Sequence, residues 1–219
     1  MDGGKMKRFL FVIFFFAFQP LLFGLSFGPF ISISQGGTNS APQVAVAANG
    51  NAFAVWSNFP NLIQTAFFNA AINPPTGAWS APVNLATGIV PQIGIDQNGN
   101  AFVAWVSTVS TTANQILVTR FNATSMAFAP FVQLSTSGTN FNPQIAVNGV
   151  GVAVVIWQNI PAGVLSASFV PMTGTWTSPI QLSTTTPPAN FALDNFNRGI
   201  AIFSTQPQGV VQATRIFAP

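Results

Sequence analysis

Four similar segments recur along the chain, and this repeat is the feature that most restricts its fold. The segments NAFAVW, NAFVAW, VAVVIW and GIAIF end at Trp56, Trp105, Trp157 and Phe203, which gives spacings of 49, 52 and 46 residues. A shorter apolar segment precedes each of them: PQVAV, PQIGI, PQIAV and NFAL. Repeat periods of about 20 to 50 residues are typical of propellers, solenoids and related arrays. The sequence therefore predicts one structural unit used four times.

Every unit has the composition of β-strands. A third run reads IQTAFFN, ILVTRFN, VLSASFV and VVQATRIF, and a fourth reads AWSAPVNLAT, AFAPFVQLST and TWTSPIQLST. These runs are rich in β-branched and aromatic residues and are bounded by Gly, Asn, Pro and Ser. The NGN tripeptides at residues 49–51 and 98–100 favour tight hairpins. We expect an all-β chain with four strands per unit and no sustained helix.

The repeat is displaced relative to the chain. The fourth unit has no fourth run, whereas GPFISIS, which begins at Gly28, resembles the run APFVQLST and precedes the first unit. Blades of four strands stack around an axis because a single blade cannot bury both of its faces. The sequence thus predicts a four-bladed β-propeller in which the N-terminal strand, residues 29–35, completes the last blade. The predicted blades are residues 41–87, 90–136, 142–184 and 188–219.

Other β architectures fit the strand pattern less well. A β-sandwich built from two duplicated halves would give similar strands. A parallel β-helix would need much shorter coils. Two chains could also pool their blades into an eight-bladed ring, because known propellers have about four to eight blades. The oligomeric state therefore stays open at this point.

The N-terminal 26 residues have the pattern of a secretory signal. Lys5, Lys7 and Arg8 precede the apolar run FLFVIFFFAFQPLLFGL, and Gly24 and Ser26 are small residues before the expected cleavage site. The alternative is an uncleaved membrane anchor, but Gln19 and Pro20 interrupt the run. We expect residues 1–26 to be removed, leaving a secreted or cell-surface propeller of residues 27–219.

Charge is scarce in the remaining chain. Three arginines, Arg120, Arg198 and Arg215, stand against Asp96 and Asp194, so three minus two leaves a formal charge of +1. Binding of nucleic acid requires clustered Lys and Arg to replace counterions. We therefore expect no nucleic-acid partner, and no membrane association once the signal is cleaved. The chain has no cysteine, so packing without disulfides must hold the fold.

The residue types exclude most catalytic chemistry. The whole chain has no His, Cys, Tyr or Glu, and the mature part has two carboxylates, Asp96 and Asp194. Both occupy the same repeat position, nine residues before the aromatic anchor, where an aspartate that bonds its own backbone forms a turn. General acid–base catalysis, zinc and calcium all need groups that this set does not provide. We expect no catalytic residue, no metal and no cofactor.

The repeat also predicts the roles of two further groups of residues. Arg120 and Arg215 share a position in blades 2 and 4, so Arg120 is predicted to pair with Asp96 and Arg215 with Asp194. The aromatic residues that recur between blades are predicted to pack in the core. Phe59 and residues 106–115 depart from the repeat and are therefore the places where a ligand is expected, although the ligand-binding residues themselves are unknown.

The unit PQIGIDQNGNAFVAW … FAPFVQLST resembles the repeats of secreted bacterial β-propeller proteins of the sialidase and kelch types. The resemblance covers residues 28–219 but is architectural. The sialidase motif Ser-x-Asp-x-Gly-x-x-Trp is absent, and only a Gly-x-Trp remains at residues 77–79 and 174–176. The Tyr nucleophile and its Glu partner, which a sialidase would imply, are missing.

The resulting hypothesis is a secreted, non-catalytic recognition or scaffold module for glycan or protein ligands. A sialidase-like glycoside hydrolase and a self-associating surface protein are the alternatives.

Overall fold

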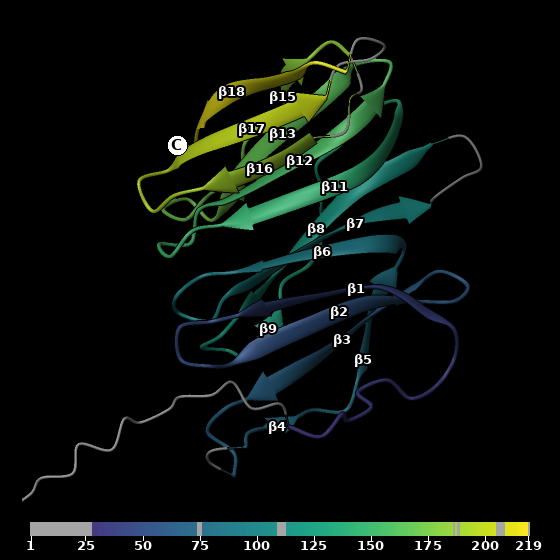
Figure 1. Ribbon diagram of the computed structural model, residues 1–219, viewed down its shortest axis with the longest axis vertical. Coiled ribbons are helices and arrows are strands. Elements are labelled where there is room, and N and C mark those ends of the chain that lie inside the picture. Colours follow the sequence, from purple (N-terminus) through teal and green to yellow (C-terminus); the bar gives the residue numbers. More distant parts are fainter. Residues whose placement is uncertain are drawn as a thin grey trace, which may run out of the picture. The chain divides into compact units, whose positions relative to one another are not determined.

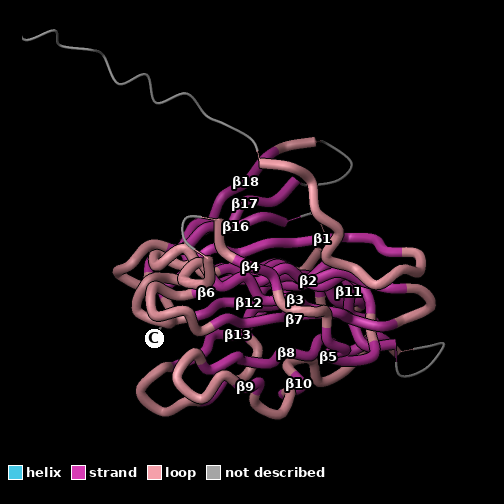
Figure 2. Tube along the Cα trace, turned by 90° about the horizontal axis from the view of Figure 1, so that it is seen from below, coloured by secondary structure: helices cyan, strands magenta, loops and turns pink. Residues whose placement is uncertain are grey.

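A computed structural model describes residues 28–73, 76–108, 113–185, 187, 189–204 and 209–218. The predicted signal peptide, residues 1–26, lies outside the described residues. The chain divides into two compact units, residues 1–31 and residues 32–219. In the described part of the chain the backbone forms strands and loops without a helix, as Figure 2 shows. No helix among these residues could therefore cross a membrane. The all-β prediction is confirmed.

Eighteen strands among the described residues form four antiparallel sheets. Sheet 1 contains β1 (Asn39–Val46), β2 (Ala52–Asn58), β3 (Leu62–Asn69), β4 (Ala78–Trp79) and β5 (Val83–Thr87). Sheet 2 contains β6 (Ile89–Ile95), β7 (Ala101–Thr108), β8 (Asn114–Asn122), β9 (Ala127–Phe128) and β10 (Val132–Gln133). Sheet 3 contains β11 (Thr139–Val147), β12 (Ala153–Ile160), β13 (Gly163–Val170), β14 (Thr175–Trp176) and β15 (Ile180–Ser183). Sheet 4 contains β16 (Ala189–Leu193), β17 (Arg198–Ser204) and β18 (Val211–Phe217).

The predicted fourth strand of each unit is broken into two pieces. In sheets 1, 2 and 3, both pieces pair with the third strand, as β4 and β5 do with β3. The break falls at Pro82, Pro130 and Pro179. Proline has no N–H for the ladder, so it is tolerated on an edge strand but interrupts pairing there. Sheets 1, 2 and 3 therefore have five strands each, and two short strands together form one edge of the sheet.

Within residues 32–219 the sheets lie in a row, in chain order (Figure 1). Their first strands β1, β6, β11 and β16 are neighbours, and each sheet packs face to face against the next. Successive side chains on a strand point to opposite faces, so one strand serves two interfaces. We call the face directed to the next sheet the forward face and the opposite one the backward face.

The second strand of each sheet supplies most of the packing between sheets. Val55 on the forward face of β2 packs against Trp105 on the backward face of β7. Ala104 of β7 packs in the same way against Trp157 of β12, and Ile156 of β12 packs against Phe203 of β17. β7 and β12 are consequently buried on both faces. Trp105, Trp157 and Phe203 lie in these interfaces, and Trp56 is buried beside Ile33, so the prediction of a core role for the recurring aromatic residues is confirmed.

The predicted closure by an N-terminal strand is wrong for this structure. Residues 28–38 form no strand, and among the described residues β18 pairs with β17 alone. The reason lies in the row of sheets, because sheet 1 and sheet 4 stand at its two ends (Figure 1). Closing the row into a ring of four would require these two sheets to meet. The four sheets thus form an open stack.

Candidate functional site

A β-bulge recurs at the start of the first strand in three sheets. The register shifts between Ser40 and Gln43 in β1, and equivalent shifts occur in β6 and β11. The residue before the proline has a positive φ in all three: 48° at Ala41, 52° at Val90 and 49° at Asn142. A β-branched residue such as Val90 rarely adopts this conformation. Strained positions of this kind cost about 1–3 kcal/mol each and cluster at functional sites.

Two of these bulges border a pocket between sheets 1 and 2. The pocket has a volume of about 310 Å³ and is lined by Thr38, Ser40, Ala41, Ser57, Asn58, Phe59, Pro60, Ile89 and Val90. The Val90 amide donates to the Ser57 hydroxyl across the interface, at 3.1 Å. Phe59, a predicted ligand contact, lies at the rim with 74% of its surface exposed. We call this the Phe59 pocket.

A second pocket lies between the same two sheets, on the side of their outer strands. It has a volume of about 460 Å³ and is lined by Ala86, Thr87, Trp105, Ser107, Gln115, Leu117, Phe131 and Gln133. The exposed ring of Phe131 stands nearly perpendicular to the Trp105 indole, with centroids 6.1 Å apart. We call this the Phe131 pocket. It presents hydroxyl and amide groups beside aromatic rings and has no charged side chain in its lining.

Trp105 differs from its counterparts in how its indole N–H is satisfied. The N–H of Trp56 donates to Gln64 and that of Trp157 donates to Asn140, each at 3.0 Å. The Nε1 atom of Trp105 is buried and has no acceptor within the described residues. A buried donor without a partner costs about 1–3 kcal/mol. The indole of Trp105 thus lies under the Phe131 pocket with its N–H buried beside Gly88.

The two pockets flank the connection between sheets 1 and 2 at Gly88. The backbone there runs against Trp105, so a Cβ on Gly88 would lie 2.3 Å from its Cδ1 atom. Only glycine permits this approach. Thr87, on one side of Gly88, lines the Phe131 pocket, and Ile89, on the other side, lines the Phe59 pocket. Gly88 thus lies between the two pockets, in close contact with Trp105.

The structure brings both predicted ligand regions to this end of the sheets. Phe59 follows β2, and Ser107 and Gln115 of the predicted loop line the Phe131 pocket, while residues 109–112 lie outside the described residues. Sequence reasoning missed Phe131 itself. A signal was present, because the segment APFVQL has one residue more than APVNL and SPIQL, and the extra residue is Phe131.

A smaller pocket repeats the Phe59 position between sheets 3 and 4. Its volume is about 210 Å³, and amides replace the phenyl ring. Asn142 donates a hydrogen bond to the Gln158 side chain within it. The lining residues are Asn142, Gln144, Ile156, Trp157, Gln158, Ala189 and Asn190.

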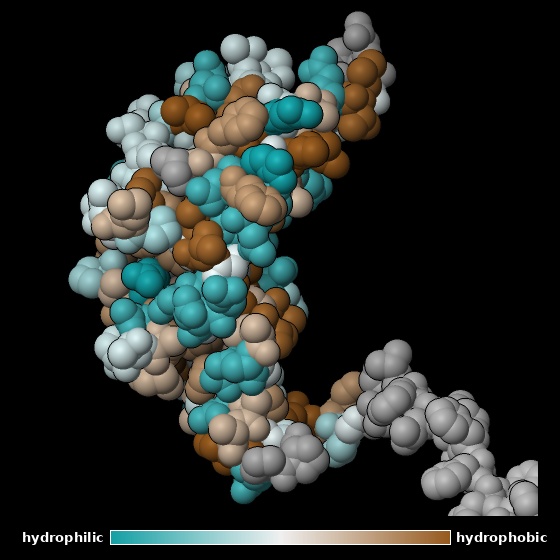
Figure 3. All heavy atoms as spheres, turned by 90° about the vertical axis from the view of Figure 1, so that its left-hand side faces the viewer, coloured by the Kyte–Doolittle hydropathy of each residue, from teal (hydrophilic) through white to brown (hydrophobic). Residues whose placement is uncertain are grey.

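The carboxylates lie at the opposite end of the sheets, in the turns that join first and second strands. Asp96 accepts hydrogen bonds from the amides of Asn98 and Asn100, and it is 3% exposed. Asp194 accepts from the amides of Phe196 and Arg198 in the same way. The predicted turn-forming role is confirmed. Figure 3 looks onto this end, where polar and apolar side chains alternate over the surface.

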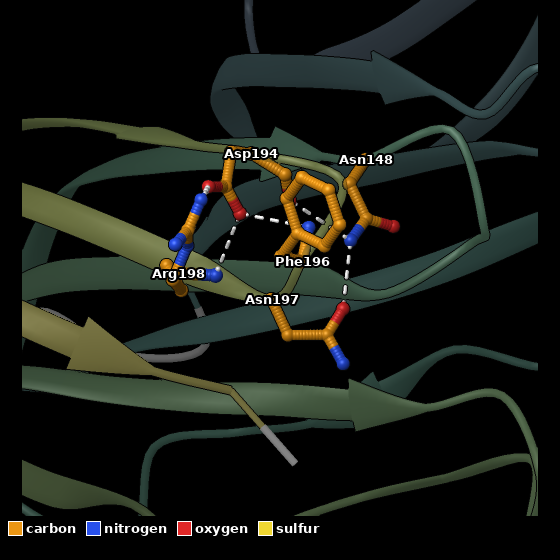
Figure 4. Close-up of polar contacts among 5 residues, drawn as sticks. All are labelled: Asn148, Asp194, Phe196, Asn197 and Arg198. Atoms are coloured by element: carbon orange, nitrogen blue, oxygen red, sulfur yellow. Dashed lines mark hydrogen bonds and ion pairs between the residues drawn. The ribbon is translucent and has the colours of Figure 1, made fainter.

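The turn of sheet 4 is tied to the turn of sheet 3 (Figure 4). The Asn148 side-chain amide donates to the Asn197 side chain at 2.9 Å and to the Asp194 carbonyl at 3.2 Å. Arg198 forms an ion pair with Asp194 at 2.7 Å. Hydrogen bonds from Arg198 hold the pKa of the Asp194 carboxyl below its ordinary value. Both side chains are substantially exposed, so this pair contributes little to stability.

The predicted charge pairs are wrong. Asp194 pairs with Arg198, four residues away, and forms no ion pair with Arg215 in the part of the chain described. The Arg120 guanidinium lies over the rings of Phe102 and Phe169, 5.7 and 5.5 Å from their centroids. The error arose because a shared repeat position places Asp96 and Arg120 in one sheet without placing them in contact. Arg120 is an aromatic contact between sheets 2 and 3.

No group of three or more metal-ligating side chains occurs among the residues that the structure describes. The two aspartates belong to different sheets, and each is used within its own turn. The geometry therefore offers hydrogen bonding and ring stacking at the two pockets.

No protein-family model and no curated protein matches the chain. Solved structures do. An ulvan lyase of polysaccharide lyase family 25 has a TM-score of 0.58 and 10% identity, over 82% of this chain and 53% of the lyase. A Hadza microbial sialidase, Hz136, has a TM-score of 0.53 and 10% identity, over 81% of this chain and 44% of the sialidase.

The fungal lectin of Aleuria aurantia, a six-bladed β-propeller that recognises fucose, has a TM-score of 0.55 and 14% identity. The match covers 84% of this chain and 59% of the lectin. The chain thus spans about half the length of the structures it matches. At these identities the similarity concerns the fold: the open stack of antiparallel sheets resembles successive blades of part of a β-propeller.

Proposed function

We propose that the protein is a non-catalytic, lectin-like module that binds a neutral saccharide at the end of sheets 1 and 2 where the Phe59 and Phe131 pockets lie. The observation that carries the proposal is the lining of the Phe131 pocket. An exposed phenyl ring, two glutamine side chains and two hydroxyl groups line one space of about 460 Å³.

This set of groups suits a sugar for two reasons. The apolar face of a pyranose ring packs against an aromatic ring, and its hydroxyl groups both donate and accept hydrogen bonds. Gln115 and Gln133 supply side-chain amides, which can both donate and accept hydrogen bonds. Small-ligand sites generally combine an apolar wall with a few placed polar groups. A charged ligand would lack a counter-charge here, which favours a neutral glycan.

The proposal does not include catalysis. General acid–base cleavage of a glycosidic bond needs a pair of carboxylates or comparable groups at the reacting bond. Neither pocket has a carboxylate in its lining, and both aspartates lie at the other end of the sheets. The basic and apolar character of residues 1–26 supports export, which would place such a module where it meets extracellular or cell-surface glycans.

Binding to an array of neutral oligosaccharides, followed by calorimetry with the best ligand, tests the proposal. Loss of the stacking ring in Phe131→Ala is expected to weaken binding about tenfold or more, which corresponds to about 1.4 kcal/mol. Phe196→Ala is the matched control, because Phe196 is also an exposed phenylalanine and lies at the opposite end of the sheets. Phe59→Ala decides whether the Phe59 pocket belongs to the same binding surface.

Three outcomes would contradict the proposal. The first is the absence of binding to any neutral glycan. The second is an equal effect of Phe131→Ala and Phe196→Ala, which would place the ligand elsewhere. The third is release of sugar from a bound oligosaccharide, which would revive the hydrolase interpretation.

A further inference from the structure

The forward face of sheet 4 is apolar and uncovered. On this face Phe102 of β7 and Ile156 of β12 are at most 1% exposed, because the next sheet covers them. The equivalent residues of β17, Ile200 and Ile202, are 56% and 44% exposed. A depression of about 460 Å³ lies over this face and is lined partly by Ile200, Arg215 and Phe217. Sheet 4 therefore has a face that resembles the internal interfaces, and no sheet among the described residues covers it.

The backward face of sheet 1 also carries apolar side chains that no neighbouring sheet covers. Val44 and Val46 of β1 lie opposite Ala54 and Ala52, on the face that carries Trp56, and are 62% and 63% exposed. The equivalent residues in sheets 2 and 3 are partly buried in the clusters between sheets. They are Ile93, Ile95, Ile145 and Val147.

Residues 32–34 pack on this backward face, at a position that an outer strand occupies in the other sheets. Ile33 packs against Ala54, Trp56 and Ala66. In the same way, Leu85 packs against Trp105, and Leu134 packs against Trp157. Leu85 belongs to the outer strand of the preceding sheet, where β5 pairs with β3. Residues 32–34 therefore stand where the outer strand of a sheet preceding sheet 1 would stand.

We propose that a second copy of this chain docks head to tail, with the backward face of its sheet 1 on the forward face of sheet 4. The occupant is argued from the three internal interfaces, each of which joins one forward face to one backward face. Among the described sheets, the backward face of sheet 1 is the one that no other sheet covers. Sheet 1 and sheet 4 lie at opposite ends of the row, so the backward face that covers sheet 4 comes from another copy (Figure 1). A formal charge of about +1 for residues 27–219 gives little repulsion between copies.

The internal repeats also fix the register of the new contact. Asn84 of β5 lies opposite Gln64 of β3, and Gln181 of β15 lies opposite Leu165 of β13. Ser32 occupies the position of Asn84 in the repeat, and Gln212 occupies that of Gln64. Ser32 of one copy therefore pairs with Gln212 on the open edge of β18 of the other copy. Backbone hydrogen bonds along this edge and apolar packing behind it act together.

A cation–π contact marks the same interface. Arg120 on the forward face of sheet 2 lies over Phe169, which belongs to the backward face of sheet 3. Arg215 has the position of Arg120, and Phe68, which lies opposite Ala52, has the position of Phe169. The docked copy thus places its Phe68 under Arg215. Because docking joins two different surfaces of the chain, repeated docking gives either a closed ring of copies or a filament.

Cysteine cross-linking tests this contact, because the natural chain has no cysteine. Directly opposed residues of antiparallel strands have Cα atoms about 4.5–5.5 Å apart, within the range for a disulfide. Ser32→Cys and Gln212→Cys are made as separate variants of the full chain, mixed and oxidised. We expect a disulfide that joins one variant to the other, and none between Ser40→Cys and Gln212→Cys, where the register is wrong.

The double variant separates the alternatives. A disulfide within one chain would show that the two faces meet in the same molecule, and this result would overturn the proposal. The absence of any Ser32–Gln212 disulfide in the mixture would do the same. Sedimentation is the independent measurement, in which Ile202→Asp should weaken self-association at least about tenfold while the circular dichroism of the fold is retained.

This inference does not rest on the proposed glycan binding, because Phe131 lies at the strand ends of sheets 1 and 2. A dimer-deficient Ile202→Asp variant that still binds glycan would leave both proposals separable.

Discussion

β12 and β17 are the same strand of the repeat in two different surroundings. Both alternate apolar residues on both faces, as VVIW in one and IAIF in the other. β12 is buried along both faces, whereas β17 has buried and exposed side chains in strict alternation. The alternation of apolar residues along a strand therefore indicates which of its faces are suited to burial. Whether a face is buried depends on the neighbour that is present.

The largest expected effect comes from truncating the forward face in each strand. Ile156 is 1% exposed between sheets 3 and 4, and Ile156→Ala should reduce the free energy of unfolding by about 2–5 kcal/mol. Ile202 is the matched residue of β17, and at low protein concentration Ile202→Ala should change it by less than about 0.5 kcal/mol. Urea unfolding of both variants is the measurement.

Repeating the measurement at several protein concentrations makes this test more specific. Docking of a second copy would cover Ile202, so its truncation should become more costly as the concentration rises, because association stabilises the folded state. Equal costs for the two variants in dilute solution would show that sheet 4 is already covered.

A smaller effect is expected for the two arginines at one repeat position. Arg120 lies over two phenylalanine rings, so Arg120→Ala should cost about 0.5–2 kcal/mol of folding free energy. Arg215 is exposed beside an uncovered face, and Arg215→Ala should have little effect on a single molecule. Thermal unfolding of both variants measures the difference. A larger loss for Arg215→Ala than for Arg120→Ala would contradict the assigned contacts.

The smallest effect concerns the turn of sheet 4. Arg198 lowers the pKa of Asp194 in the folded protein, so the ionised carboxylate stabilises the fold at neutral pH. This contribution is present above the unfolded-state pKa of about 4 and is lost as the pH falls through the lower folded-state pKa. The stability difference between the natural protein and Asp194→Asn should shrink between about pH 5 and pH 2. Persistence of the difference at pH 2 would assign it to the turn geometry.

Much of the fold could be predicted from the sequence, because local signals repeat in each unit. The strand pattern, the Asn-Gly hairpins and the core position of Trp105 and Trp157 all follow from alternation and turn chemistry, which act within a few residues. The turn roles of Asp96 and Asp194 were predictable for the same reason.

The remaining features depend on contacts between units, about which the pattern carries no information. Residues 29–35 have the sequence of an outer strand, but nothing local decides which sheet stands beside them. Arg120 was assigned to an aspartate on the basis of shared repeat position, whereas its rings come from two adjacent sheets. In the candidate site, Phe59 could be foreseen as a departure from the repeat. The unused donor of Trp105 could not, since its counterparts find acceptors at different sequence positions.

The uniform direction of the stack has a consequence for how such a molecule can change in length. Every junction joins a forward face to a backward face, so a duplicated segment of about 50 residues would meet compatible surfaces on both sides. Unequal recombination between repeats could therefore add or remove a whole sheet while leaving the flanking packing intact. The number of units is a variable that this architecture leaves free to evolve.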